Sequence, residues 1–146
     1  MRRLLRELLR RGRRERRPPG VEDGTLARCP RSPCCVSSQA GDPAKRLDPL
    51  PLTGTAAEAR QRLLAVLASW PRTRLARDDG SYLHAECSTP LLGFVDDLEL
   101  LLDEAAGAIQ VRSVSRIGNY DFGTNRRRVE RLRRDLTAAG DSAATS

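Results

Sequence analysis

The sequence predicts an α+β domain with two layers: a helix, a four-stranded antiparallel meander and a second helix. Three observations support this fold class. A capping box and an amphipathic helical pattern begin at Thr55, polar and apolar residues alternate over residues 73–117, and a basic helical pattern begins near Thr124. Helices on either side of a run of strands are typical of an α+β domain, in which they pack together on one face of the sheet.

Composition places this domain in the middle of the 146-residue chain. Seven of the nine prolines lie between Pro18 and Pro51, so residues 18–52 are expected to form a long irregular segment. The folded domain is expected at residues 53–137 and a disordered tail at residues 138–146. A domain of this size can fold alone with modest stability.

The formal net charge of +7 belongs to the first 17 residues, which hold nine arginines and two glutamates. Leucines at helical spacing among these arginines indicate a basic amphipathic arm over residues 1–17. We expect a solvated, mostly disordered arm, and contact with lipid or protein is the alternative. Residues 2–17 would suit an anionic membrane surface or an acidic protein. Nucleic acid is not favoured, because no aromatic residue stands among the arginines to stack on bases.

No apolar run reaches the length of a membrane span, and the arginine-rich start lacks the apolar region of a secretory signal. We therefore expect a cytoplasmic protein that can lie at the periphery of a membrane.

The first helix is predicted to begin after Thr55, because Thr55 and Glu58 have the spacing of a capping box. Pro71 ends it. The apolar face of this helix comprises Ala59, Leu63, Val66, Leu67 and Trp70.

The first hairpin is expected to turn at residues 78–80, a three-residue loop with glycine in the left-handed conformation. This loop sets Leu75 opposite Leu83 and Thr73 opposite Ala85, which gathers apolar groups on one face. A two-residue loop would bring arginines beside that face, so we reject it.

The next two strands are expected to pair Leu102 with Ile109 around a loop at residues 103–108. This register places every apolar residue of both strands on the helix-facing side except three, Val95, Leu101 and Val114. The further pairs that it predicts are Leu100 with Val111, Leu98 with Ser113, and Phe94 with Ile117.

The opposite face of the sheet then carries ionisable groups, and we expect a solvated face of cross-strand ion pairs. Glu99 would lie opposite Arg112, with Asp97 diagonal to Arg112 and Arg116. The alternative is a polar surface that binds a ligand, and a pair of His84 with Asp97 would suit general base catalysis. The residues of this face are His84, Glu86, Asp97, Glu99, Arg112 and Arg116.

On the helix-facing side, Asp96 falls opposite Ser115, where an unpaired carboxylate would be costly. Asp96 must bond to backbone amides of residues 118–124, to an arginine of the last helix, or to a ligand. The first turn of that helix holds three arginines, residues 126–128. Cations oppose the helix dipole there, so free amides and arginines would suit a phosphate or a carboxylate.

Three cysteines lie in the stretch CPRSPCCVSSQ: Cys29, Cys34 and Cys35. A disulfide from Cys29 to Cys34 or Cys35 would close this loop, although a cytosolic protein would keep its thiols reduced. A nucleophilic cysteine and a zinc site that also uses His84 and Cys87 are the alternatives. Zinc is disfavoured, because residues three apart in a strand face opposite sides.

The chain resembles the Domain of Unknown Function family 1499, which occurs in bacteria and in plants, including plastid forms. The resemblance covers residues 29–136 and rests on CPRSPCCVSSQA, on GFVDDLEL at residues 93–100 and on RSVSRIGNYDFGTNRRRVERLR at residues 112–133. It implies a shared fold, a shared site at the three motifs, and a disulfide between Cys29 and Cys35, since relatives usually carry asparagine at Cys34 and an aromatic residue at Cys87. Many relatives also carry an apolar export or anchoring segment where this chain has its basic arm. The resemblance implies no activity.

We therefore expect a binding or accessory module that is not an enzyme and that uses no cofactor and no metal. One alternative is a hydrolase-like enzyme with Asp96 or Asp97 as base, and another is a membrane-surface or nucleic-acid adaptor acting through the arm. The candidate site would bind a small anion or lock the last helix to the sheet. Its residues are Asp96, Asp97, Arg112, Ser113, Ser115, Arg116, Asn119, Asp121, Asn125 and Arg126.

Overall fold

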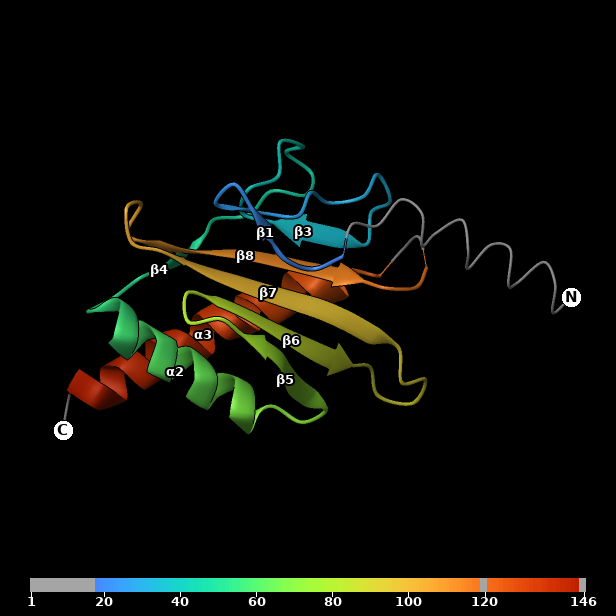
Figure 1. Cartoon of the computed structure of the whole chain (residues 1–146). Coiled ribbons are helices and arrows are strands. Elements are labelled where there is room, and N and C mark those ends of the chain that lie inside the picture. The colour runs from blue at the N-terminus through green and yellow to red at the C-terminus, as the bar shows by residue number, and fades with distance from the viewer. Residues whose placement is uncertain (1–17, 119–120, 145–146) are drawn as a thin grey trace, which may run out of the picture.

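The computed structural model describes residues 18–118 and 121–144 (Figure 1), so the basic arm at residues 1–17 and Asn119 lie outside the described residues. The helices are α2 (Ala56–Ser69) and α3 (Thr124–Ala144). The strands are β1 (Val21–Glu22), β2 (Thr25–Leu26), β3 (Cys35–Ser37), β4 (Leu50–Pro51), β5 (Thr73–Asp78), β6 (Tyr82–Ser88), β7 (Val95–Asp103) and β8 (Ala108–Ser115).

The α+β class with two helices and a large antiparallel sheet is confirmed, but the sheet has six strands instead of four. The strand order is β3-β8-β7-β6-β5, and β4 also pairs with β8 (Figure 1). The proline-rich segment is therefore not wholly irregular, because β3 and β4 pair antiparallel with β8. This pairing satisfies backbone groups that β8 would otherwise expose at the edge of the sheet.

The pairing of β7 with β8 agrees with the predicted register over most of its length. Leu102 pairs with Ile109, Leu100 with Val111 and Leu98 with Ser113. The predicted pair of Phe94 and Ile117 lies beyond the paired strands, which end at Asp96 and Ser115. The chain turns before β7, where the Phe94 carbonyl accepts the Thr89 N–H at 2.8 Å, and Phe94 and Ile117 are both exposed.

The first hairpin differs from the prediction by two residues. Leu75 pairs with Ala85 instead of Leu83, because Asp78 belongs to β5 and a bulge lies between Leu75 and Arg77. The connection is residues 79–81, and Gly80 has the expected positive φ of 78°. A shift by an even number of residues keeps each side chain on its face, so the predicted facing of the β6 residues holds.

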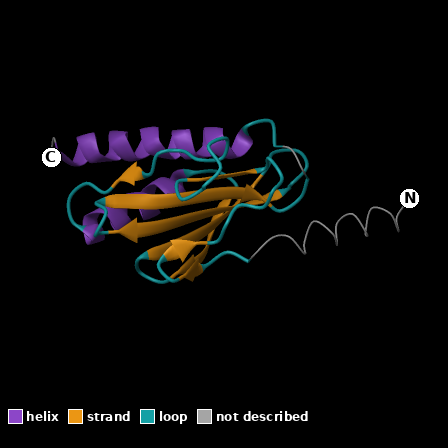
Figure 2. Ribbon diagram, turned by 90° about the horizontal axis from the view of Figure 1, so that it is seen from above, coloured by secondary structure: helices purple, strands orange, loops and turns teal. Residues whose placement is uncertain are grey.

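Both helices pack on one face of the sheet (Figure 2). Their apolar residues join those of β6, β7 and β8 in a single core, in which Leu63, Leu98, Leu100, Val111 and Leu132 are fully buried. The capping box of Thr55 and Glu58 is present at the start of α2. Helix α3 continues to Ala144 where a disordered tail was expected, because alanines favour the helix and Ala139 packs against the core.

The opposite face of the sheet is covered as well, which corrects the two-layer expectation. The N-terminal segment, residues 18–28, lies across it (Figure 1). Leu26 of β2 packs there against Tyr82 and Leu101. His84, Asp97, Glu99 and Arg112 are therefore buried, although a solvated face was expected.

A disulfide joins Cys29 to Cys35, with the two Cα atoms 5.7 Å apart, so the pairing implied by the family resemblance is confirmed. Cys34 stays outside this bridge and is buried beside Ser115. Cys87 is buried in the core under the helices. His84 and Cys87 face opposite sides of the sheet, and no group of three His, Cys, Asp or Glu side chains among the described residues could hold a metal ion.

The Cys29–Cys35 bridge is expected to stabilise the fold, because it fixes the loop that precedes β3. Cys29→Ser should lower the free energy of unfolding by about 2–3 kcal/mol in the loop-entropy model, measured by urea denaturation. Cys34→Ala, which keeps the bridge, is the control. Peptide mapping of the oxidised protein should recover Cys29 linked to Cys35, and a Cys29–Cys34 peptide would contradict the assignment.

Candidate functional site

The candidate residues are divided between the two faces of the sheet, because consecutive residues of a strand point to opposite sides. Asp96, Ser113 and Ser115 point towards the helices, whereas Asp97 and Arg112 point towards the N-terminal segment. The structure therefore forms two separate networks where one site was expected.

The helix-facing network is centred on Asn125, which is fully buried in the first turn of α3. Its Oδ1 accepts hydrogen bonds from Ser113 Oγ at 2.7 Å and from Arg128 Nη1 at 2.8 Å. Its Nδ2 lies 2.9 Å from Ser115 Oγ and 2.7 Å from Asp121 Oδ2. One amide side chain thus joins α3 to the last strand.

Asp96 is satisfied by an arginine of the last helix, the second of the three expected possibilities. Arg128 Nη2 donates to Asp96 Oδ2 at 2.7 Å, and both side chains are largely buried. The candidate list missed Arg128, although its position one turn after Asn125 could have indicated that both face the sheet.

Asp121 caps the start of α3 and bonds to backbone amides that an anion at this helix end would otherwise use. Its carboxylate accepts the Gly123 N–H at 2.8 Å and the Asn125 N–H at 3.1 Å. Arg126 is exposed, belongs to neither network, and donates to the carbonyl of Ala44 at 3.1 Å. The helix-facing candidates therefore lock α3 to the sheet.

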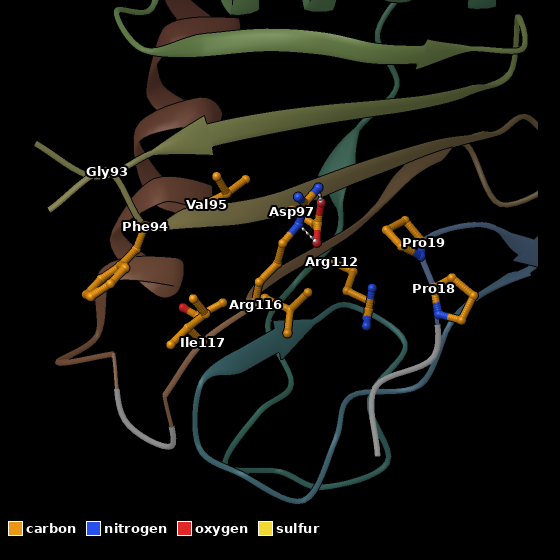
Figure 3. Close-up of a pocket in the computed structure, with 11 residues that line it drawn as sticks. Pro18, Pro19, Gly93, Phe94, Val95, Asp97, Arg112, Arg116 and Ile117 are labelled. Carbon is orange, nitrogen blue, oxygen red and sulfur yellow. Dashed lines mark hydrogen bonds and ion pairs between the residues drawn. The ribbon is translucent and has the colours of Figure 1, made fainter. Parts of the chain in front are cut away.

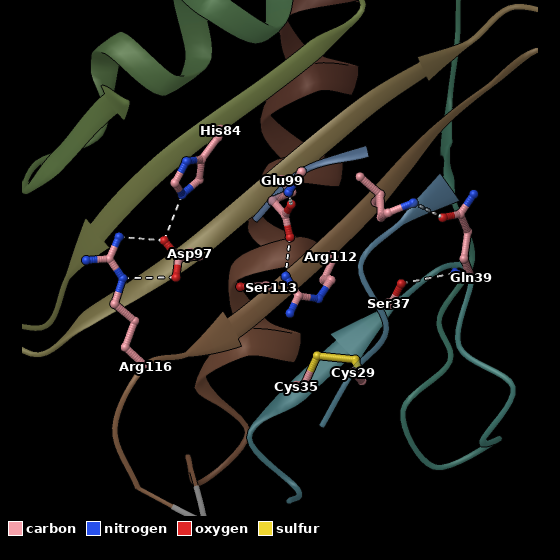
Figure 4. A network of polar contacts seen from close by, with 12 residues as sticks. Cys29, Cys35, Ser37, Gln39, His84, Asp97, Glu99, Arg112, Ser113 and Arg116 are labelled. Carbon is pink, nitrogen blue, oxygen red and sulfur yellow. Dashed lines mark hydrogen bonds and ion pairs between the residues drawn. A yellow bond between two sulfur atoms is a disulfide. The ribbon is translucent and has the colours of Figure 1, made fainter. Parts of the chain in front are cut away.

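The network on the other face has Glu99 at its centre (Figure 4). Glu99 is fully buried and pairs with Arg112, while its Oε1 also accepts from Tyr82 Oη at 2.7 Å and from the Gly20 N–H at 2.8 Å. Burial and the neighbouring carboxylate raise the pKa of Tyr82. Arg112 is 1% exposed, and its Nε–H has no hydrogen-bond partner among the described residues.

Asp97 is held by two donors on this same face (Figure 4). Arg116 binds it through Nε at 2.9 Å and Nη2 at 2.8 Å, and His84 Nε2 lies 2.7 Å from Oδ1. Burial raises the pKa of Asp97, but the hydrogen bonds from His84 and Arg116 outweigh it and hold the pKa at about 2. Asp97 is therefore ionised at neutral pH, so His84 must donate through Nε2.

A cleft of about 390 Å³ opens beside these ion pairs, between Pro18 and Pro19 on one side and the start of β7 and end of β8 on the other. Figure 3 shows Arg112 and Arg116 between the two prolines and the pair Phe94 and Ile117. The full lining is Pro18, Pro19, Gly93, Phe94, Val95, Asp97, Arg112, Val114, Ser115, Arg116 and Ile117.

The apolar walls of this cleft were not among the predicted site residues. The predicted register of β7 and β8 already indicated them, because it placed three apolar residues, Val95, Leu101 and Val114, on the polar face. Val95 and Val114 line the cleft and Leu101 packs under Leu26. Apolar side chains on a face of ion pairs indicate that this face is covered.

A family model described as "Protein of unknown function (DUF1499)" matches residues 25–136, which is most of the chain. No curated protein and no solved structure matches. Within the described residues, neither helix has the length and apolar character needed to cross a membrane.

Asn125 is expected to contribute strongly to stability, because its removal would take a hydrogen-bond partner from several buried donors and acceptors. Asn125→Ala should lower the free energy of unfolding by about 2–4 kcal/mol, measured by urea denaturation. Arg126→Ala is the matched control on the next residue, and it should change stability by less than about 0.5 kcal/mol. Equal effects of the two substitutions would show that the buried network does not lock the helix.

The lowered pKa of Asp97 predicts a pH dependence of stability. A carboxyl whose pKa falls from 3.8 to about 2 on folding stabilises the protein above pH 3.8, and this contribution is lost as the pH falls through 2. The shift corresponds to about 2 kcal/mol. Asp97→Asn should therefore be less stable at pH 7 and lose less stability than the wild type between pH 5 and pH 2, as measured by guanidinium denaturation. Parallel pH profiles for the two proteins would contradict this role.

Proposed function

The chain belongs to the DUF1499 family, and we propose that it is a non-enzymatic binding module whose cleft takes a small molecule with an apolar body and a carboxylate or phosphate group. The proposal rests on one observation: Arg112 is a buried cation that lines the cleft, and its Nε–H has no hydrogen-bond partner among the described residues.

The Arg112 guanidinium has an N–H group, at Nε, that Glu99 does not bind. Glu99 accepts from Tyr82 and Gly20 as well as from Arg112, so a single carboxylate serves three donors. Leaving a buried N–H without a partner costs about 1–3 kcal/mol. An anionic group in the cleft would compensate part of that cost by bonding the guanidinium or by drawing it into better geometry.

Arg116 supplies the second cation at the same cleft. Its side chain is 43% exposed, and Nε and Nη2 are the nitrogens that bond to Asp97. Two guanidinium groups that line one cleft suit a planar or tetrahedral anion, and apolar walls at Phe94, Val95 and Ile117 suit an apolar body.

No observation favours the hydrolase alternative. Asp97, with a pKa of about 2, is too weak a base to take a proton near neutral pH. Asp96 lies on the helix-facing side and is paired with Arg128. The adaptor alternative depends on residues 2–17, which lie outside the described residues, and a cytoplasmic or membrane-peripheral location stays a prediction.

Thermal melts test the proposal with three anions: inorganic phosphate, succinate and octanoate. A ligand that binds only the folded protein adds about 1.4 kcal/mol of stability at ten times its dissociation constant, which raises the melting temperature by several degrees. We expect the largest shift with octanoate, because only octanoate has an apolar chain to occupy the walls.

Arg116→Ala should be less stable than the wild type, because buried Asp97 then keeps only His84 as a partner, but it should still fold and should lose this ligand-dependent shift. Arg77→Ala is the matched control, because Arg77 is also exposed and ion-paired but does not line the cleft. Absence of a shift with all three anions in the wild type, or an equal shift in Arg116→Ala, would refute the proposed function.

A further inference from the structure

We infer that one end of the sheet docks on an anionic lipid bilayer. Five of the seven large apolar side chains that are exposed in the described residues lie in two connections, β6–β7 and β8–α3. Leu91 and Leu92 are 106% and 72% exposed, and Phe94 and Ile117 are 43% and 45% exposed. These four residues are called the apolar end below.

The pairing of β7 with β8 places the four side chains at the same end of the sheet. Asp96 at the start of β7 pairs with Ser115 at the end of β8, so both connections leave the sheet at the same end. Phe94 and Ile117 line the same cleft and lie near one another in Figure 3. Phe122, the fifth exposed residue, is 76% exposed just before α3.

The charge at the apolar end is positive on its exposed surface. Arg126 and Arg127 are exposed there, as is Arg72, whose carbonyl accepts the Ser88 N–H at the end of β6. Arg116 is exposed there too, but its charge is balanced by Asp97 and Glu86. Among the described residues of the two connections, the one acidic side chain is Asp121, which is half-buried and bonded to Asn125.

The opposite end of the sheet has the opposite character. The β5–β6 and β7–β8 connections begin with or lie beside four acidic residues, Asp78, Asp79, Asp103 and Glu104. Asp78 and Asp79 pair with Arg60 and Arg77, so Asp103 and Glu104 carry the negative character of this end. A molecule with one basic, apolar end and one acidic end would be oriented by an anionic surface, with the apolar end towards the lipid.

The basic arm joins the domain beside the apolar end. Pro18 lines the cleft together with Phe94 and Ile117, and the 17 residues before it hold nine arginines and two glutamates. Stable attachment to a membrane usually needs two signals, and the arginines in the sequence of these 17 residues would add positive charge to the apolar side chains of the described end.

A bilayer fits these residues better than a protein partner does. Leu91 lies in a turn, where it has a positive φ of 57°. Its side chain is fully exposed, so it does not form the wall of a groove that could hold a peptide. A fluid surface needs no matching shape, only apolar side chains at its depth and positive charge above them.

Sedimentation with vesicles tests the inference on the full chain. Wild type should bind vesicles of equal parts phosphatidylcholine and phosphatidylglycerol much more strongly than vesicles of phosphatidylcholine alone. The double variant Leu91→Ser/Leu92→Ser should bind the anionic vesicles about tenfold more weakly, because two apolar side chains no longer enter the lipid.

Val21→Ser is the matched control and should bind as the wild type does. Val21 is also an exposed apolar residue, but it pairs with Leu26, which packs on Tyr82 and Leu101 away from the apolar end. Unchanged binding of the double variant would show that the arm acts alone and would overturn the inference. Equal binding of wild type to neutral vesicles would overturn the role of charge.

Tryptophan fluorescence provides a second measurement, in which insertion into lipid changes a signal and no loss of binding is needed. Leu92→Trp places an exposed indole at the apolar end, while the native Trp70 is buried. Its fluorescence should shift to the blue on anionic vesicles and be quenched by lipids with brominated acyl chains. No quenching despite binding would overturn insertion. This test is independent of the cleft, whose ligand is probed by soluble anions and by Arg116→Ala.

Discussion

Strands β7 and β8 are covered on both faces, so polar residues that are neighbours in the sequence are buried on opposite sides of the sheet. Asp96 and Asp97 are separated in this way, as are Arg112 and Ser113. Each buried polar group needs a partner, and the partners come from neighbouring strands, as His84 does for Asp97 and Arg112 for Glu99, or from the covering segments. Helix α3 provides them on one face, and the N-terminal segment provides the Gly20 amide on the other.

This requirement couples segments that are far apart in the sequence. Asn125 Nδ2 lies 3.1 Å from the carbonyl of Cys34, so the start of α3 and the cysteine loop meet at the end of β8. β3 follows directly and pairs with β8, while the disulfide ties Cys29 to Cys35. The three motifs that carry the family resemblance therefore form one structural unit, and most of their polar residues bond to each other.

Much of the fold could be predicted because polar and apolar residues alternate clearly along β7 and β8, and this pattern can be read without knowledge of distant contacts. The β5–β6 register shifted because a bulge has no clear sequence signature, yet an even shift preserved the faces. The strands β3 and β4 could not be predicted, since two or three residues carry no periodicity and depend on distant pairing. The burial of Asp97, Glu99 and Arg112 was not predicted, because charged residues are usually solvated. In this protein Gly20, Tyr82 and the prolines replace the solvent around Glu99 and Arg112.

Near the start of β7 and the end of β8, charged side chains are buried and apolar side chains are exposed, which is the reverse of an ordinary protein surface. Arg112, Glu99 and Asp97 are inside, whereas Leu91, Leu92 and other apolar side chains are outside. Burying charges is costly even when they are paired, and exposing clustered apolar groups forgoes the stabilisation of packing them. Neither feature contributes to folding as much as a conventional core and surface would. The unbonded Nε–H of Arg112, the cleft and the exposed leucines thus lie on the same side of the sheet, and the two binding proposals rest on this arrangement of buried charge and exposed apolar groups.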